Sequence, residues 1–529
     1  MASRSVFLIG FAASGKSTVG KLVAEKLGLP FVDLDNAVEA EMGISISQAF
    51  AEHGEEFFRE KEKSVLASLV GGEAKVMATG GGTACLPDAV SLLRKNGLVV
   101  FLHADLEDCV ARARAASAKR PLMSMSSDEL SALYADRQSD YRQAHVVIAS
   151  DTEINAASSV CKVAMAAEEI SDVELSGTTF VATGRHICPV VVSRGVLQTA
   201  NARLEKRDRP YTGIAVVTDT NVGPLYAEKL LPEASAITLP AGEQSKSLSQ
   251  FANLQDRLIE QGLDRGSAVL ALGGGVIGDL VGFAASTLFR GIPLVQIPTS
   301  VLAMVDSSVG GKTGVNTDGG KNLVGAFWQP DTVLVDPNTL KTLPVEERQA
   351  AFGEVLKYGL LDGPNFLADV ERNANEFART GEVSDSFVQL IVRCIQYKAW
   401  AVTLDEREKY GVRAFLNLGH TVGHAIEASA GYGVVAHGRA VALGLLATCR
   451  VSKRLGVTKS DLEPRVADIL RIAGIEPEID RWLKKDVLRW VNVDKKRTGD
   501  LVDFIALEDV GSPKIHKLSV NDLETALLK

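Results

Sequence analysis

The sequence predicts an α/β protein in three parts: two α/β domains built on parallel sheets, followed by an all-helical domain. In the first two parts, short apolar runs alternate with amphipathic helical patterns, as in strands joined by crossover helices. Each of these parts also has a glycine-rich turn between a predicted strand and a predicted helix, the position at which α/β folds bind phosphates. From about residue 340 onward, strand patterns nearly vanish and helical periodicity dominates.

The predicted strands follow in order along the chain. In the first part they cover residues 6–9, 31–34, 76–78, 98–102 and 146–148, and an alanine-rich helix at 155–170 closes the domain. In the second part they cover residues 214–218, 236–239, 268–272, 294–297 and 332–335. A new pattern starts at Ser171, which places a boundary near residues 167–173. The predicted domains are therefore residues 1–170, 171–339 and 340–529.

Length and composition are those of an ordinary globular protein. At 529 residues the chain is too long for one core, since a domain usually takes about 100 to 200 residues. The net charge of −9 argues against a general nucleic-acid surface. Six cysteines without a CxxC pair indicate neither a disulfide framework nor a thiolate metal site, which fits a cytoplasmic protein.

Two apolar segments resemble targeting or membrane segments. Residues 6–9 lead directly into a glycine loop and lack a cleavage-site pattern, so we expect a buried strand rather than a signal peptide. Residues 268–289 contain three consecutive glycines and Asp279, which fit a strand, a ligand-binding turn and a helix better than a membrane span. We therefore expect no membrane partner.

The segment from Gly10 to Ser17 fits the pattern of a phosphate-binding loop. In such a loop, backbone N–H groups surround the nucleotide phosphates at a helix N-terminus, the lysine reaches the outer phosphates and the serine binds magnesium. We therefore predict ATP and Mg2+ as ligands. The residues expected to bind them are Gly10, Gly15, Lys16, Ser17 and Thr18.

Three further segments indicate the acceptor. Two carboxylates, Asp33 and Asp35, end a predicted strand, Arg59 follows in an acidic segment, and residues 79–83 form a second glycine-rich turn. The order and spacing of these segments resemble shikimate kinase over essentially the whole first domain. The resemblance implies that Asp33 lies near the magnesium ion. It also implies that shikimate is bound by Asp35, Arg59, Gly80, Gly81, Gly82 and Arg137, although Arg137 has a solvated surface position as its alternative.

The same resemblance implies a mobile lid. Arg120, followed by Pro121 and Leu122, matches the lid arginine that closes on the transferring phosphate and stabilises its charge. The chain departs from the family at two positions. Met123 stands where the lid usually has leucine, and Ala13 stands where the loop usually has glycine, so we expect the loop to use a negative φ at Ala13.

A second set of residues has the pattern of a metal site. His420 and His424 are four residues apart and share one face of a predicted helix, and His437 follows them. Glu354 and Lys357 lie one helical turn apart in an earlier segment. Together they offer nitrogen and oxygen ligands for a zinc-like ion with an open coordination position. Histidines packed in a helical core are the alternative, which the clustering disfavours.

This set and its surroundings resemble 3-dehydroquinate synthase. The matching segments are residues 273–279, 298–314, 321–325 and 416–427, and the match extends from about Val173 to the C-terminus. The resemblance implies that Glu354, His420 and His437 bind Zn2+ or Co2+. The turn at 273–279 lacks the usual GxGxxG spacing but has the strand and helix of a Rossmann-like domain. The implied NAD-binding residues are Asp219, Asn221, Glu243, Lys246, Gly274, Gly275, Asp279, Thr299 and Ser300.

Basic residues form much of the remaining implied site. In an acidic chain their usual explanation is a solvated surface, which is the alternative at each position. The resemblance implies reaction roles for Lys312, Asn322, Lys357, Lys398, Arg413 and His424. It implies substrate binding by Arg290, Asp306, Lys321, Asn417 and Lys496. Arg439 is a departure, because the family more often has a carboxylate or amide there, beside the last metal-binding histidine.

The two resemblances together imply a bifunctional enzyme acting on small-molecule substrates. The first domain would transfer phosphate from ATP to shikimate. The second half would use NAD and a metal ion to convert 3-deoxy-D-arabino-heptulosonate 7-phosphate to 3-dehydroquinate and phosphate, regenerating NAD in each turnover, and would form a homodimer. Two alternatives stay open: a first domain that only senses nucleotide, and a second half that is a metal-dependent alcohol dehydrogenase.

Overall fold

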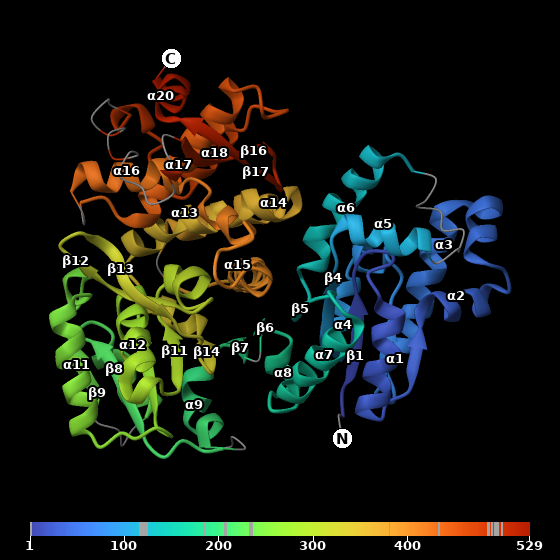
Figure 1. Ribbon diagram of the computed structural model, residues 1–529, viewed down its shortest axis with the longest axis horizontal. Coiled ribbons are helices and arrows are strands. Elements are labelled where there is room, and N and C mark those ends of the chain that lie inside the picture. The colour runs from blue at the N-terminus through green and yellow to red at the C-terminus, as the bar shows by residue number, and fades with distance from the viewer. Residues whose placement is uncertain are drawn as a thin grey trace. The chain divides into compact units, whose positions relative to one another are not determined.

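The computed structural model describes residues 3–115, 125–184, 186–205, 209–231, 236–379, 381–431, 434–483, 487, 490, 497–498 and 501–528. The chain divides into two compact units, Met1–Val191 and Val192–Lys529. The predicted parallel α/β sheets and the helical C-terminal part are confirmed (Figure 1). No helix among the described residues is long and apolar enough to cross a membrane.

The first unit is built around a parallel sheet. Its strand order is β2 (Phe31–Asp33), β3 (Val76–Ala78), β1 (Ser5–Ile9), β4 (Gly97–His103), β5 (Val146–Ala149), β6 (Thr178–Thr183) and β7 (His186–Val192). Every residue of β1 and β3 is buried, as expected for a sheet covered on both faces. All five predicted strands are confirmed. The antiparallel hairpin of β6 and β7 was not predicted.

The helices of the first unit connect these strands. They are α1 (Lys16–Leu27), α2 (Leu34–Met42), α3 (Ile46–Val70), α4 (Ala89–Asn96), α5 (Leu106–Ala115), α6 (Ser127–Tyr141), α7 (Glu153–Glu168) and α8 (Asp172–Leu175). Helix α1 buries Val19, Val23 and Leu27 on one face and ends at Gly28, whose φ of 69° is the left-handed value that favours glycine. The predicted closing helix corresponds to α7.

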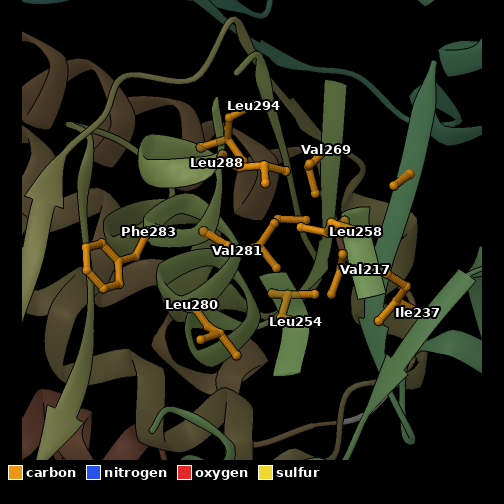
Figure 2. Close-up of a cluster of buried hydrophobic side chains, with 14 of the residues drawn as sticks. Val217, Ile237, Leu254, Leu258, Val269, Leu280, Val281, Phe283, Leu288 and Leu294 are labelled. Atoms are coloured by element: carbon orange, nitrogen blue, oxygen red, sulfur yellow. The ribbon is translucent and has the colours of Figure 1, made fainter. Parts of the chain in front are cut away.

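The second unit begins with parallel strands in the order β14 (Thr332–Val335), β11 (Leu294–Pro298), β10 (Ala268–Gly273), β8 (Ile214–Asp219) and β9 (Ala236–Leu239). These are the five strands that the sequence predicts. Helices α9 (Val196–Glu205), α10 (Gly223–Leu230), α11 (Leu248–Glu260) and α12 (Gly275–Thr287) accompany them. Leu254 and Leu258 of α11 and Val281 of α12 join a buried cluster with Val217 and Val269 of the sheet (Figure 2). An antiparallel hairpin, β12 (Lys312–Thr317) and β13 (Gly320–Phe327), precedes β14.

The remainder of the second unit is mainly helical. Its helices are α13 (Val345–Asp362), α14 (Pro364–Phe377), α15 (Asp385–Leu404), α16 (His420–Ala430), α17 (His437–Arg454), α18 (Glu463–Ile472) and α20 (Val520–Leu528). The prediction of an all-helical domain is wrong near the C-terminus, where β15 (Arg497–Thr498), β16 (Leu501–Asp509) and β17 (Ser512–Ser519) form an antiparallel sheet. Residues 504–507 of β16 are all buried, and such a continuous apolar run does not distinguish a strand from a buried helix by periodicity.

Candidate functional sites

The phosphate-binding loop connects β1 to α1. Gly15 precedes α1 with a φ of 97°, which leaves the first N–H groups of the helix directed at the loop. The buried Lys16 ammonium donates to the carbonyl oxygens of Gly10 and Phe11, each at 2.8 Å. Ser17 Oγ donates to Asp33 Oδ2 at 2.7 Å. The loop, its lysine and the predicted magnesium ligands therefore come together in one place.

Ala13 differs from its prediction. Its φ is 61°, in the left-handed region, and not negative as the sequence led us to expect. The loop keeps the shape that glycine favours, and the alanine Cβ takes on the strain, which is about 1–2 kcal/mol for an ordinary residue. The shape of the loop therefore determines this backbone angle more than the residue type does.

The predicted acceptor residues surround the second glycine-rich turn. A Cβ atom on Gly80 would lie 2.7 Å from Asp35 Oδ1, and a Cβ atom on Gly82 would lie 2.6 Å from Arg59 Nη2. Glycine is thus required at both positions for the two charged side chains to approach the turn. Arg137 Nη1 donates to the carbonyl oxygen of Gly81 at 3.2 Å. This half-buried arginine is not the solvated surface residue of the alternative reading.

The environment of Asp35 favours its neutral form. Burial raises the pKa of Asp35 to about 6, the Lys16 ammonium opposes this rise, and the carboxylates of Asp33 and Glu62 add to it. A carboxyl group with this pKa changes its charge close to neutral pH, which suits a group that accepts a proton. The structure therefore places a carboxyl group with a raised pKa beside the phosphate-binding loop.

One residue of this site was missed from the sequence. The fully buried Glu62 accepts hydrogen bonds from Arg59 Nη1 at 2.7 Å and from Thr83 Oγ1 at 2.5 Å. Glu62 thereby links Arg59, which lies on the same helix α3, to Thr83 beside the glycine turn. Its position three residues after Arg59, on the same helix face, was the available signal. The lid arginine Arg120 and its neighbours Pro121, Leu122 and Met123 lie outside the described residues.

The second cluster lies in the helical part of the second unit. Ligand atoms of Glu354, His420 and His437 all lie within 4.8 Å of one another. The Nε2 atoms of both histidines lie 3.3 Å from Glu354 Oε1. Glu354 is fully buried, and its Oε2 atom pairs with the Lys357 ammonium. Two imidazoles and a buried carboxylate form a donor set for a divalent cation.

Glycines at the helix contacts bring these ligands together. Helix α13 packs on α17, and α17 packs on α16 (Figure 1). A Cβ atom on Gly353 would lie 2.0 Å from the Gly438 carbonyl oxygen, and one on Gly444 would lie 1.9 Å from that of Gly419. Gly353, Gly419 and Gly438 are each directly adjacent in sequence to one of the three ligands. The helix backbones are therefore in direct contact beside each ligand.

Glu427 was not predicted. It supplies a carboxylate beside His437, where Arg439 of this chain replaces the carboxylate or amide that is more usual in the family. Its Oε2 atom lies 2.9 Å from His437 Nδ1, and its Oε1 atom lies 3.4 Å from Lys321 Nζ. Arg439 itself is exposed. A carboxylate on the second ring nitrogen fixes the orientation of an imidazole ligand. Glu427 lies seven residues after His420, on the same face of α16, which was the signal in the sequence.

A second acidic and basic group adjoins this cluster. Lys357 pairs with Glu354, and Asp306 accepts hydrogen bonds from Tyr358 Oη and Lys398 Nζ, each at 2.8 Å. Burial disfavours a charged Glu354, but Lys357 and His420 outweigh it and hold the pKa of Glu354 well below its usual value. Burial lowers the pKa of Lys398 to about 8, opposed by Asp306. This lysine therefore changes charge only a little above neutral pH.

The other predicted synthase residues are brought together less uniformly. Arg413 donates to the Gly310 carbonyl at 3.1 Å. Lys312 pairs with Glu408, whose carboxylate lies 3.8 Å from Arg413 Nε. The Asn322 backbone N–H donates to the Asn316 side chain. Asn417 lies three residues before the start of α16, the helix that carries His424. His424 is exposed, and its ring centroid lies 5.2 Å from that of His420. Arg290 is exposed, with a φ of 67°, and no hydrogen bond or ion pair joins it to these residues in the described part of the chain. Lys496 lies outside the described residues.

The predicted NAD-binding residues line the carboxyl ends of parallel strands. β10 runs into Gly274 and the start of α12, and the Thr299 backbone N–H donates to the Gly273 carbonyl at 3.0 Å. A Cβ atom on Gly275 would lie 3.0 Å from Ser307 Oγ, and one on Gly274 would lie 3.6 Å from Ser300 Oγ. Lys246 pairs with Asp279 across this turn. Such an edge is where open α/β sheets bind their ligands.

Two further predicted NAD residues stabilise loops at the same edge. Asp219 Oδ1 accepts from the backbone N–H groups of Asn221 and Val222 at 2.8 and 2.9 Å. Glu243 Oε1 accepts from Asn316 Nδ2 at 2.7 Å. These bonds stabilise the loops that follow β8 and β9.

The fold and the two clusters define an enzyme with two separate sites, one of them a phosphoryl-transfer site. Residues 12–169 match the family model of shikimate kinase, and residues 236–350 and 351–497 match the N-terminal and C-terminal models of 3-dehydroquinate synthase. The chain belongs to the 3-dehydroquinate synthase family and carries a shikimate kinase domain before it. It is a bifunctional enzyme of the shikimate pathway, and a nucleotide-sensing first domain without activity is not favoured.

Individual relatives agree with the family models. A 3-dehydroquinate synthase of Acidithiobacillus ferrooxidans is 41% identical over 339 residues, which are 63% of this chain and 92% of the relative. One of Streptococcus pneumoniae is 38% identical over 354 residues, 65% of this chain and 98% of the relative. A solved 2-deoxy-scyllo-inosose synthase, complexed with carbaglucose-6-phosphate, NAD+ and Co2+, matches with a TM-score of 0.59 and 26% identity over 66% of this chain and 99% of that one.

Proposed function

We propose that Asp35 accepts the proton of the shikimate hydroxyl as that hydroxyl attacks the outer phosphate of ATP. The observation that carries this proposal is the contact of Asp35 with the Gly80 turn, beside the loop that holds Lys16. Arg59 and Arg137, on either side of the same turn, bind the carboxylate and hydroxyls of shikimate. Lys16 neutralises the transferring phosphate, Ser17 and Asp33 hold Mg2+, and Arg120 closes over the site.

The donor set of the second cluster fits a divalent metal. Glu354 is buried, its Oε2 atom pairs with Lys357, and its Oε1 atom faces two imidazole nitrogens. We assign Glu354, His420 and His437 as the ligands of Zn2+ or Co2+. When bound, the metal would polarise a substrate hydroxyl, and NAD at the 273–279 turn would supply the means to oxidise and later reduce the substrate. Glu427 orients His437 through its second ring nitrogen.

The basic residues around the metal cluster bind the acidic sugar phosphate substrate. Lys357 and Lys398 form ion pairs with Asp306, and these contacts fix the positions of the carboxylate and the two ammonium groups. Lys312, Lys321, Asn322, Arg413 and Asn417 supply further donors to carboxylate, hydroxyl and phosphate groups, joined by Arg290 and Lys496. His424, next to the metal ligands on α16, transfers protons at the reacting carbon. Each oxygen of such a substrate would thereby meet a donor.

The family likeness supports a proposal for the assembly and the location of the protein. We assign a homodimer formed through the synthase half, a cytoplasmic location, and no nucleic-acid or membrane partner. The free state of all described cysteines supports a location in a reducing compartment, and the acidic net charge of −9 argues against a nucleic-acid partner. Domain boundaries at residues 170 and 339 are part of the same proposal, and the kinase family match that ends at residue 169 supports the first of them.

Two assays on the purified protein test these assignments. We expect shikimate-dependent release of ADP and release of phosphate from the heptulosonate phosphate, without net accumulation of NADH. Lys16→Ala should abolish the first activity alone, and Glu354→Ala the second alone. Stoichiometric NADH accumulation would instead identify the second half as a simple alcohol dehydrogenase.

A further inference from the structure

A polar cavity of about 510 Å3 lies apart from both proposed active sites, beside the first turn of α13 and the segment between α14 and α15. Arg348, Arg372 and Arg379 line it, together with two glutamates, two asparagines and a serine. Its volume lies within the range of about 300–1,000 Å3 that is usual for small-molecule sites. None of its lining residues takes part in the assignments above.

Arg348 is the unusual member of this wall. Its side chain is 1% exposed. Its Nη2 atom donates to the Glu376 carbonyl at a long 3.4 Å, while Nε and Nη1 have no hydrogen-bond partner among the described residues. The guanidinium also lies 5.4 Å from the centroid of the Phe387 ring. A buried cation with unpaired donors costs free energy, so packing alone does not explain an arginine here.

The acidic residues of the wall bind other partners. Glu376 accepts from the Ser384 backbone N–H at 2.6 Å and from the Ser384 hydroxyl at 2.7 Å. Glu382 pairs with Lys341 at 2.7 Å. These bonds occupy the carboxylates at the N-terminus of α15 and leave the donors of Arg348 unsatisfied. The cavity therefore lacks a negatively charged hydrogen-bond acceptor for Arg348 among the residues that the structure describes.

We propose that this cavity binds the oxyanion group, carboxylate or phosphate, of a small polar molecule, with Arg348 as its anchor. A guanidinium presents paired N–H groups that match two oxygens of such a group. The amide of Asn375 in the same wall suits a hydroxyl group on the rest of the ligand, whereas the amide of Asn373 already bonds to Asp369 and Ser386. Arg348 precedes Glu354 by six residues on α13, about 9 Å along the helix axis, so the ligand would bind on the helix that carries the metal cluster.

A ligand-binding role for Arg348 has a consequence for the thermal stability of the protein. If Arg348 is present for a ligand, Arg348→Met removes an unpaired buried charge and should leave the thermal midpoint unchanged or raised in buffer without oxyanions. If Arg348 were a structural residue, the same substitution would lower the midpoint, and that result would count against the site.

Selenate is a suitable probe because it is an oxyanion that anomalous scattering locates. Crystals of the full-length protein, grown without sulfate or phosphate and soaked in sodium selenate, should show a selenium peak within hydrogen-bond distance of Arg348. The peak should be absent in Arg348→Met, weakened in Arg348→Lys, and unchanged in Arg471→Met, which alters an exposed arginine on α18. No peak in the wild-type cavity, or a peak that persists in Arg348→Met, would overturn the proposal.

Competition and solution measurements complete the test. Displacement of selenate by inorganic phosphate alone would identify a phosphate ligand, and displacement by acetate as well would identify a carboxylate; persistence under both would overturn the assignment. Calorimetric titration with selenate should show one binding event more for the wild type than for Arg348→Met. Equal titrations would mean an adventitious ion only, which also overturns the proposal.

Discussion

At the scale of single residues, the role that we propose for Asp35 in the reaction has a cost for the fold. Its pKa of about 6 lies above the usual value of 3.8 because of burial. As pH rises between these two values, the unfolded chain loses the proton first, so the contribution of Asp35 to folding stability falls and stays low above pH 6. A residue that destabilises its own domain at neutral pH is typical of a functional site.

Asp35→Asn should therefore have two opposite effects. Shikimate phosphorylation should fall by 10² or more, about 3 kcal/mol in the activation barrier, while ATP affinity stays nearly intact. The thermal midpoint should rise at pH 7 to 8 but not below about pH 4. In the wild type, kcat/KM for shikimate should increase with pH through about 6. Loss of ATP affinity in the variant would show that the carboxylate serves the nucleotide instead.

Ala13 offers a second prediction at this scale. Because its φ of 61° is strained for alanine, Ala13→Gly should stabilise the kinase unit by about 1 kcal/mol. The measurement is the urea concentration at which kinase activity is lost. Ala12→Gly is the matched control, since Ala12 has no positive φ, and it should give no gain. An equal gain from both substitutions would rule out the strain as the cause.

Residue identity allowed most of the candidate sites to be predicted, but not the residues that support them. Asp35, Arg59 and the glycine turn come together as expected, because motif order fixes which strand ends they occupy. Glu62 and Glu427 were missed because a carboxylate on an exposed-looking helix face has no distinctive pattern until its partner is known. The φ of Ala13 was predicted wrongly because the ligand-binding shape of the loop outweighs the local preference.

At the scale of elements, the long alternating patterns were predictable and the short hairpins were not. All ten predicted parallel strands are present, because each is an apolar run between a turn and a helix. The hairpins β6–β7 and β16–β17 depend on pairing between neighbouring strands, which a single strand pattern does not reveal. The close approach of α13 to α17 could not be predicted either, since glycines within helices are also found without such contacts.

The contact of α13 with α17 is testable by adding one methyl group. A Cβ atom on Gly438 would lie 1.8 Å from the Ala350 carbonyl oxygen, so Gly438→Ala must push the helices apart. We expect loss of bound metal and at least a 10²-fold loss of synthase activity, because His437 moves with α17. Kinase activity should not change. Gly71→Ala, where a methyl group meets open space, is the control for the substitution itself.

Glu427 connects two elements through its carboxylate, so its charge is the property to remove. Glu427→Gln keeps the shape of the side chain but weakens the bond to His437, and metal affinity should fall about 10- to 100-fold. Competition with a chelator measures this without reference to activity. Glu463→Gln, which alters a carboxylate paired with Arg450, should leave metal affinity unchanged. Unaltered affinity in Glu427→Gln would exclude the orienting role.

At the scale of the whole molecule, the two activities should be separable. A fragment of residues 1–170 should phosphorylate shikimate, and a fragment of residues 171–529 should release phosphate from the heptulosonate phosphate when NAD is added. The buried Arg94 donates to the carbonyls of Ser176 and Thr178, so residues 1–170 should be less stable than residues 1–192. Loss of synthase activity in a folded Lys16→Ala full-length protein would reveal coupling between the halves.

The backbone contacts between α13, α16 and α17 also bear on how the enzyme meets a shortage of metal. Helix backbones, rather than the ion, set the spacing of Glu354, His420 and His437, and Lys357 offsets the carboxylate charge. Such a protein does not need to refold when its ion leaves. Cells starved of zinc would then keep a reserve of intact synthase that regains activity as fast as metal is supplied, without new translation.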